Sequence, residues 1–100
     1  MKSDDFLDDK ALRNAILRHI ESGKYRLSRH AAEEQAKDDI DLHDTLHVLK
    51  TGFHEHKKPE FNNKFKNWHY AIRGRTEDLK TVRVIICFTD EMLIVTVMEL

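Results

Sequence analysis

The sequence has few of the residues that cross-link or interrupt a chain. Its 100 residues include one Cys, one Pro and three Gly. So little Pro and Gly argues against a long disordered linker, and this length is usual for one domain. We therefore expect a single domain over residues 1–100, with a helical part at 4–50 and a sheet part at 53–98. Cys87 cannot form a disulfide within the chain, so a reducing cytoplasm is the expected location.

Long apolar runs and cofactor signatures are absent too. Val84–Phe88, one of the longest apolar runs, is far shorter than the ~20 residues that span a membrane. The acidic start, Met1–Asp5, lacks the apolar stretch of a signal peptide. The sequence contains no Gly-rich phosphate loop and no GxSxG elbow. We expect no membrane partner and no cofactor.

The net charge is −1 with neutral histidines, so the chain as a whole does not indicate nucleic-acid binding. The distribution of charge is uneven, however. Residues 1–44 hold eight Lys/Arg against eleven Asp/Glu, whereas residues 57–83 hold eight against three, a balance of +5. This basic segment is either a footprint for phosphates or the solvated surface of strands and loops, and both interpretations stay open.

The first half of the chain predicts three helices. Apolar residues recur at helical spacing from Leu7, and Gly23 ends this first helix. The other helices are predicted from caps: Ser28 begins a second that runs to about Lys37, and Asp41 begins a third that ends at Gly52. Between the first two helices, residues 25–27 can form a short edge strand.

After residue 52 the apolar period changes from 3.6 to 2, which predicts strands. They are expected at Phe53–Lys57, Trp68–Thr76, Leu79–Phe88 and Met92–Met98, with a Pro-containing loop at Lys58–Asn67. The last two runs are apolar on both parities, as in central strands covered on both sides. The predicted class is α+β, with about three helices on one face of an antiparallel sheet of three to five strands.

Two clusters of residues could carry acid–base or phosphate chemistry. On the second helix, His30 and Glu34 share a face, so the carboxylate can fix the imidazole tautomer as a general acid or base requires. The same spacing also occurs in ordinary surface pairs. On the strand Trp68–Thr76, Arg73 and Arg75 share a face and can hold a phosphate, or they can simply be solvated. Tyr70 points to the other face, where it can stack on a base or belong to the core.

Thr96 and the histidines give weaker signals. Thr96 lies in a strand, where threonine is common, although its hydroxyl could orient a phosphate. His43 and His47 lie four apart on a helix, and His54 and His56 share a strand face. Structural zinc sites usually include Cys at tight spacing, and HExxH is absent, so we expect no metal.

The order and spacing of several short segments resemble a family of small bacterial proteins catalogued as a domain of unknown function. The resemblance covers residues 12 to 98 and rests on Ser28-Arg29-His30-Ala31, Glu33-Glu34, Lys37-Asp38, Ile40, Asp44, Val48-Leu49, Gly52, Trp68, Tyr70, Ile72-Arg73 and Ile94-Val95-Thr96. It implies a branch of the barnase–EndoU–colicin–RelE superfold, similar to the MqsR and RelE ribonuclease toxins.

The resemblance implies metal-free cleavage of RNA by its 2′-hydroxyl. It makes His30 the general base or acid, Arg73 the phosphate clamp, and Tyr70 and Thr96 positioning groups. Arg75, Lys66 and Glu34 are the expected substrate-binding residues. The implied partners are RNA and a cognate antitoxin of zinc-finger or helix-turn-helix type. The alternative is an inactive interaction module in which the same surface binds an antitoxin or a DNA-binding protein.

Overall fold

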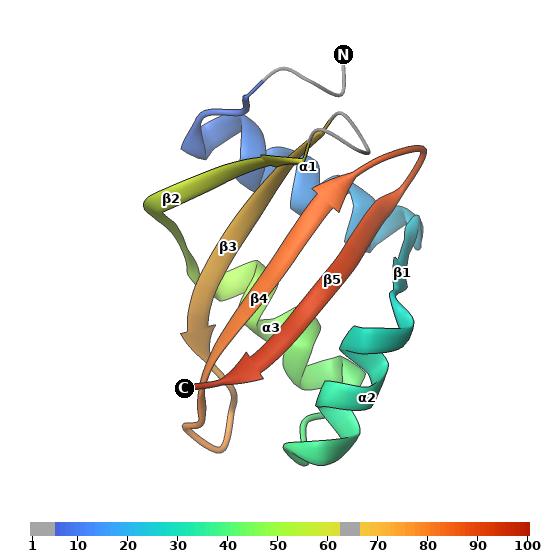
Figure 1. Ribbon diagram of the computed structural model, residues 1–100, viewed down its shortest axis with the longest axis vertical. Helices are drawn as coiled ribbons and strands as arrows, with labels where there is room; N and C mark the ends of the chain where they lie inside the picture. Colours follow the sequence, from blue (N-terminus) through green and yellow to red (C-terminus); the bar gives the residue numbers. More distant parts are fainter. Residues whose placement is uncertain (1–5, 63–66) are drawn as a thin grey trace.

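The computed structural model describes residues 6–62 and 67–100 as three helices and one five-stranded sheet (Figure 1). The elements follow in the order α1 (Asp9–Ser22), β1 (Tyr25–Leu27), α2 (Arg29–Lys37), α3 (Leu42–Thr51), β2 (Phe53–Asn62), β3 (Asn67–Arg75), β4 (Thr81–Phe88) and β5 (Met92–Glu99). The sheet order is β1-β5-β4-β3-β2. The predicted α+β class is confirmed.

The helix ends confirm the capping predictions. Gly23 ends α1 with φ 72°, in the left-handed region that glycine adopts without strain. Ser28 caps α2 by accepting a hydrogen bond from the Ala31 N–H. At α3, Asp41 and Asp44 each accept a hydrogen bond from the other's backbone N–H, which forms a capping box.

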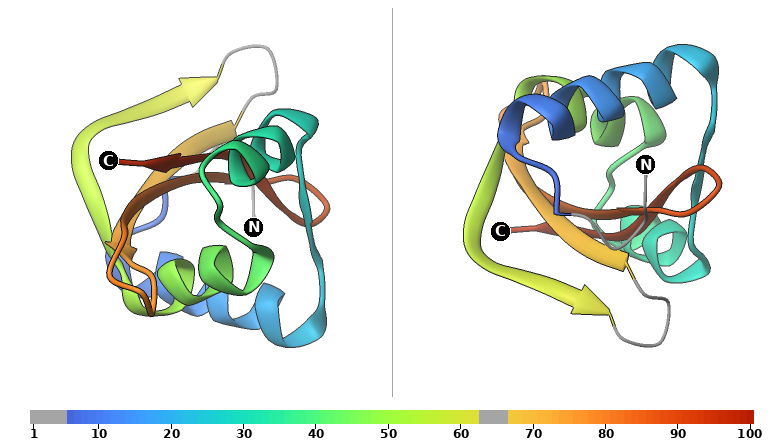
Figure 2. Two further views of the ribbon diagram at one scale, coloured as in Figure 1. Left: turned by 90° about the horizontal axis from the view of Figure 1, so that it is seen from below. Right: turned by 90° about the horizontal axis from the view of Figure 1, so that it is seen from above.

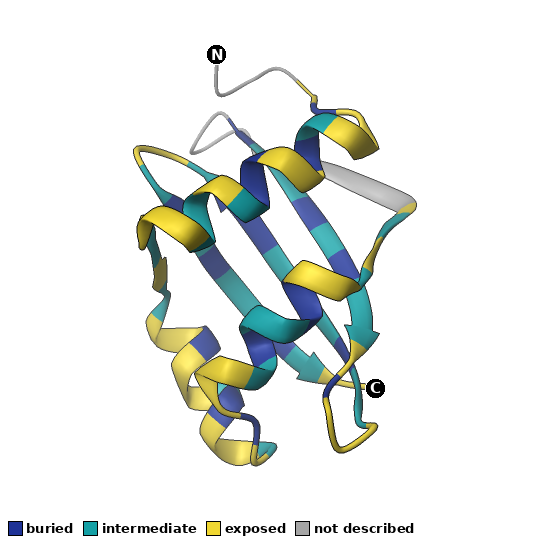
Figure 3. Cartoon of the chain, turned by 180° about the vertical axis from the view of Figure 1, so that it is seen from behind, coloured by how far each residue is buried: buried dark blue, intermediate teal, exposed yellow. Residues whose placement is uncertain are grey.

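The core lies between the sheet and the helices α1 and α3. Both views in Figure 2 show these two helices on one side of the sheet, and Figure 3 shows their exposed residues facing away from it. We call this side the helical face. Its buried strand residues are Tyr70, Ile72, Val82, Val84, Ile86, Met92, Ile94 and Val97.

The opposite side of the sheet, which we call the outer face, is only partly buried. Alternation along the strands and the cross-strand register place Ala71, Arg73, Arg83, Ile85, Thr96 and Met98 on it. A β-bulge at Val95 makes the burial of β5 change parity, from Met92 and Ile94 to Val97. Because of this change, β5 residues of both parities face the helices, so the strand can be apolar on both parities although the outer face is only partly buried.

Three expectations are corrected. The sheet is mixed, because the edge strand β1 pairs in parallel with β5 while the other pairs are antiparallel. The expected loop at Lys58–Asn67 is strand from Lys58 to Asn62 and again at Asn67, while residues 63–66 lie outside the described residues. A proline is tolerated at position 59 because β2 is an edge strand whose register shifts between Glu55 and Glu60. Leu79 lies before β4, in a turn with φ 67°, and is exposed.

None of the helices in the described part of the chain combines the length and the apolar character that a membrane crossing requires.

Candidate functional site

Helix α2 lies at the edge of the sheet beside β5, apart from the layer formed by α1 and α3 (Figure 2), so two of the helices cover one face of the sheet and not all three as predicted. β1 pairs with β5 only over Met92–Ile94. Further along β5, side chains of α2 and its cap take the place of a neighbouring strand. The Ser28 hydroxyl donates to the Val95 carbonyl at 2.9 Å, Glu34 Oε1 accepts the Val97 N–H at 3.3 Å, and Asp38 Oδ2 accepts the Glu99 N–H at 3.2 Å.

This arrangement places His30 next to the sheet. Its Nε2 lies 3.0 Å from Glu34 Oε1, and its side chain is 65% exposed while that of Glu34 is 23% exposed. A shallow hollow beside it is lined by His30, Glu33, Glu34, Lys37, Asp38 and Met98. Because Met98 belongs to the outer face, the imidazole lies on the side of the sheet that faces away from α1 and α3.

A row of cross-strand neighbours connects this hollow to two arginines. Met98 on β5 pairs with Arg83 on β4, and Arg83 pairs with Arg73 on β3. Directly opposed residues project to the same face of a sheet. Neighbouring strands lie about 4.8 Å apart, so the backbones of Met98 and Arg73 are separated by roughly 10 Å. His30 and Arg73 therefore lie on the same side of the molecule, with Arg83 between them.

Glu55 on β2 forms ion pairs with both arginines. Arg83 Nε donates to Glu55 Oε1 at 2.6 Å and Arg83 Nη2 donates to Oε2 at 3.2 Å, while Arg73 Nη1 lies 3.6 Å from Oε2. The hydrogen bonds from Arg83, assisted by its charge and by Arg73, lower the pKa of Glu55, and Glu55 in turn raises the pKa of Arg83. Two cations with one anion leave this group a net charge of +1.

The other predicted site residues are distributed more widely. Thr96 is on the outer face, opposite Ile85, and the exposed Arg75 ends β3 on the same face as Arg73. Tyr70 is buried on the helical face, where its hydroxyl accepts the Leu7 N–H at 2.9 Å, so the structure does not bring it together with Arg73. Lys66 lies outside the described residues.

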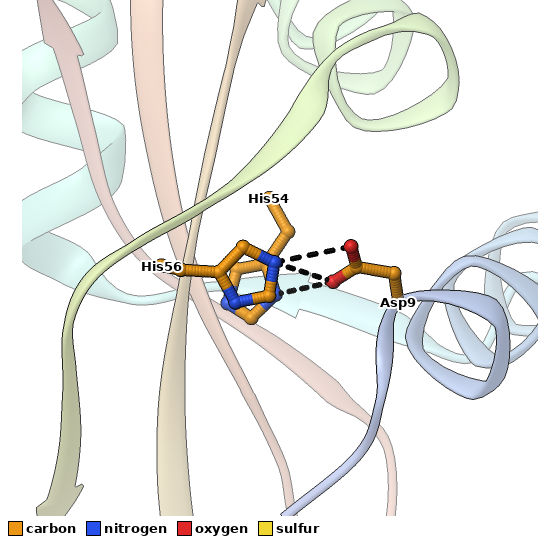
Figure 4. A group of neighbouring side chains, drawn as sticks. All are labelled: Asp9, His54 and His56. Carbon is orange, nitrogen blue, oxygen red and sulfur yellow. Dashed lines mark hydrogen bonds and ion pairs between the residues drawn. The ribbon is translucent and has the colours of Figure 1, made fainter.

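A second cluster lies on the helical face, where β2 meets the start of α1. Figure 4 shows the side chains of His54 and His56 directed toward Asp9. His54 Nδ1 lies 3.1 Å from Asp9 Oδ1, and His56 Nε2 lies 2.8 Å from Oδ1 and 3.0 Å from Oδ2. Hydrogen bonds from His56 and then His54 lower the pKa of Asp9. One ligand atom from each residue falls within 4.8 Å of the others.

The other histidines of the zinc hypothesis are bonded differently. His43 Nε2 lies 2.7 Å from Glu77 Oε1, and this carboxylate raises the pKa of the imidazole. Among the described residues, the Asp9, His54 and His56 cluster is the one group of three that could hold a metal ion. His43 and His47 do not belong to it.

Sequence reasoning missed Arg83, Glu55 and Asp9. Strand alternation alone places Arg83 on the face of the sheet that faces away from Val82 and Val84, so the position of this cation could have been found. Asp9 and Glu55 could not, because their partners lie 18 to 47 residues away in the sequence and meet them only after folding.

Comparison with curated proteins and with solved structures finds no match in either. A protein family described as "Domain of unknown function (DUF4258)" matches residues 27–99, which include α2, α3 and every strand from β2 onward. The family match contains His30, Arg73 and Arg83, as well as His54 and His56, whereas Asp9 precedes it. Since the match spans well over half of the chain, the chain belongs to the DUF4258 family.

Proposed function

We propose that this chain is a cytoplasmic, metal-independent endoribonuclease of the toxin type, with a RelE- or MqsR-like fold and a cognate antitoxin as partner. The observation that carries the proposal is the shared side of the sheet: a histidine oriented by a carboxylate, and two arginines in the cross-strand row that begins beside it. A base and a cation on one surface are the parts that RNA transesterification needs.

His30 is the proposed general base. In a neutral imidazole one ring nitrogen carries the proton and the other carries the lone pair. With Nε2–H directed at Glu34, the lone pair is on Nδ1, which can accept the proton of an RNA 2′-hydroxyl. The 2′-oxygen then bonds to phosphorus as the bond to the 5′-oxygen breaks. That oxygen takes a proton from solvent, and the products carry a 2′,3′-cyclic phosphate and a free 5′-hydroxyl.

Arg83 and Arg73 are the proposed phosphate-binding cations. Guanidinium groups bind phosphate oxygens through two parallel hydrogen bonds and stabilise charge that develops in the transition state. Arg83 is closer in the sheet to the hollow beside His30, and Arg73 is the more exposed of the two, with 42% of its side chain accessible against 31%. We therefore expect Arg73 to contact RNA first and Arg83 to require release from Glu55.

The test uses purified protein, end-labelled RNA and EDTA. Wild type should cleave RNA and leave 2′,3′-cyclic phosphate ends. His30→Ala should reduce the rate by roughly 100-fold or more, the usual contribution of an acid–base group, and Arg73→Ala by roughly 100-fold or more, the usual contribution of a group that stabilises charge in the transition state. His43→Ala is the matched control, because it also removes an exposed histidine bonded to a carboxylate. Full activity in both site variants, with unchanged circular dichroism, would exclude this site.

One observation favours a protein-binding module as the second candidate. Three carboxylates, from Glu33, Glu34 and Asp38, line the hollow beside His30, with Lys37 as the only cation of the lining. Such a surface suits a basic protein segment better than RNA. If purified protein leaves RNA intact but binds an antitoxin encoded beside it, and Glu33→Lys weakens that binding, the module explains the surface instead.

A further inference from the structure

We propose that Asp9, His54 and His56 form a binding site for a divalent transition-metal ion, with zinc as the preferred class. This site is independent of the proposed ribonuclease activity. His54 is opposite the buried Ile72 of β3 and packs against Tyr70, so it lies on the helical face, whereas Arg73 and Arg83 lie on the outer face.

The donor atoms are already gathered as a metal would require. Zinc binds imidazole nitrogen and carboxylate oxygen at about 2.0–2.2 Å, which puts neighbouring donors of a tetrahedral centre roughly 3.3 Å apart. The separations between Asp9 oxygens and the two imidazoles are 2.8 to 3.1 Å, and one donor from each residue lies within 4.8 Å of the rest. The separations between the carboxylate oxygens and the imidazole nitrogens need to increase by only a few tenths of an ångström to reach the spacing of a tetrahedral centre.

The chemistry of the donors selects the kind of metal. Two imidazoles and one carboxylate suit zinc and its first-row neighbours, whereas calcium and magnesium prefer sites made of oxygen alone. Three protein ligands leave further coordination positions open to water. These positions can face solvent, because Asp9 and His56 are well exposed, at 65% and 58% of their side chains.

His54, the buried member of the cluster, is fixed by the side chains packed around it. The His54 side chain is only 4% exposed, and its ring packs against Phe6 and Tyr70, with centroids 6.0 and 5.6 Å away. Its Nε2 is buried without a hydrogen-bond partner among the described residues, so Nδ1 is the ring atom that can interact at the cluster. One fixed ligand and two on the surface make a site that is partly organised before the ion arrives.

A simpler account is that Asp9 merely accepts hydrogen bonds from two histidines. The two accounts differ in stoichiometry, because only the first predicts one ion bound per chain. Bound metal would also join the first turn of α1 to β2 and raise the unfolding temperature in proportion to the logarithm of free ion concentration.

The experiment titrates metal-free full-length protein with Zn(II) by calorimetry and with Co(II) by visible absorption. Wild type should bind one ion per chain and show the absorption bands of Co(II) with nitrogen ligands. His56→Ala and Asp9→Asn should weaken binding by roughly 100-fold or more, because loss of an outer-shell partner alone costs about 10–100-fold. Both residues are exposed, so circular dichroism without metal should stay at the wild-type level.

His43→Ala is again the matched control. It removes a histidine that lies 2.7 Å from a carboxylate but does not belong to the Asp9, His54 and His56 cluster. It should bind zinc as wild type does. Absence of saturable one-to-one binding, or equal binding by His56→Ala and wild type, would overturn the proposal. Neither result bears on RNA cleavage in EDTA, so the two proposals can fail separately.

Discussion

Replacing Glu55 by Gln tests whether the outer-face arginines are held back from phosphate by an internal carboxylate. Glu55 accepts two hydrogen bonds from Arg83 and lies 3.6 Å from Arg73. Gln has nearly the same shape and keeps one acceptor oxygen, but it removes the negative charge. The variant should therefore be less stable than wild type and bind RNA more tightly.

The loss of stability follows from the burial of the pair. Exposed ion pairs contribute about 0–1 kcal/mol, and breaking a fully buried pair costs about 3–5 kcal/mol. Glu55 and Arg83 lie between these limits, with side chains 15% and 31% exposed. Because one hydrogen bond survives, we expect a loss of about 1–2 kcal/mol, or a fall of roughly 5–15 °C in the unfolding temperature of a domain this size.

This loss should depend on pH in a defined direction. Arg83, with a smaller contribution from Arg73, lowers the pKa of Glu55 below its ordinary value of 4.5. A lowered carboxyl pKa contributes stability that is complete above the unfolded value and disappears as the pH falls through the folded value. The difference between wild type and Glu55→Gln should therefore be constant near neutral pH and shrink in acid below about pH 4.5.

The gain in RNA affinity can be calculated from the charge alone. A unit charge about 5 Å from a phosphate at high dielectric is worth roughly 0.8 kcal/mol, or about fourfold in affinity. One more uncompensated cation should also steepen the plot of log affinity against log salt by about one. Fluorescence anisotropy with a short labelled RNA, measured over a series of salt concentrations, gives both quantities.

Glu91→Gln is the control for this experiment. It makes the same change in net charge but breaks an exposed pair with Arg26, 2.9 Å away, at the opposite end of the strands. It should cost less than about 1 kcal/mol and leave the salt slope unchanged. The reasoning would be refuted if Glu91→Gln tightened RNA binding as much as Glu55→Gln, or if Glu55→Gln left the salt slope unaltered.

Two further predictions concern stability. A Cβ added at Gly52 would lie 2.5 Å from the Arg73 carbonyl oxygen, so Gly52→Ala should lower the free energy of unfolding by about 2–3 kcal/mol. A Cβ added at Gly23 meets no atom within 4 Å, so Gly23→Ala should cost only the roughly 1–2 kcal/mol of a left-handed backbone. Urea denaturation giving the opposite ranking would contradict this account of the α3 end. Glu77 raises the pKa of His43 above 6.5, and His43 lowers the pKa of Glu77 below 4.5. A histidine whose pKa is raised in the folded protein stabilises the fold below the unfolded pKa, and this effect is lost as the pH rises through the folded pKa. Thermal unfolding should therefore find His43→Ala slightly less stable than wild type mainly at about pH 4.5–6.5. A loss of stability confined to alkaline pH would be inconsistent with the pair.

The sequence was informative wherever a structural choice depends on neighbours along the chain. Caps at Ser28 and Asp41 act on N–H groups three residues away, and Gly23 reverses the chain within one turn. The edge strand at residues 25–27 was foreseen for the same reason, since a short β-prone segment lies between two helix signals. Its parallel pairing with β5 was not, because the partner is more than 60 residues away.

The sequence was least informative where tertiary contacts decide. Pro59 and the charged residues around it are typical of a loop, yet the edge position of β2 tolerates them in a strand. For the candidate site, alternation along β3 correctly separated Tyr70 from Arg73, and the structure places them on opposite faces. The resemblance had grouped them in one site. The Asp9 cluster could not be predicted, since its histidines are only two of the three donors and Asp9 meets them only after folding.

Glu34 connects the candidate site to the integrity of the sheet. Its Oε1 lies 3.0 Å from His30 Nε2 and also accepts the Val97 N–H. β5 has no pairing with β1 in this region, so an unfilled N–H would be available to the edge of another chain. Removing this carboxylate would free the imidazole and open a strand edge at once, and lost activity would then have two causes. His30→Ala leaves Glu34 in place as the acceptor of the Val97 N–H. For that reason His30, rather than its partner, is the residue on which the ribonuclease proposal depends.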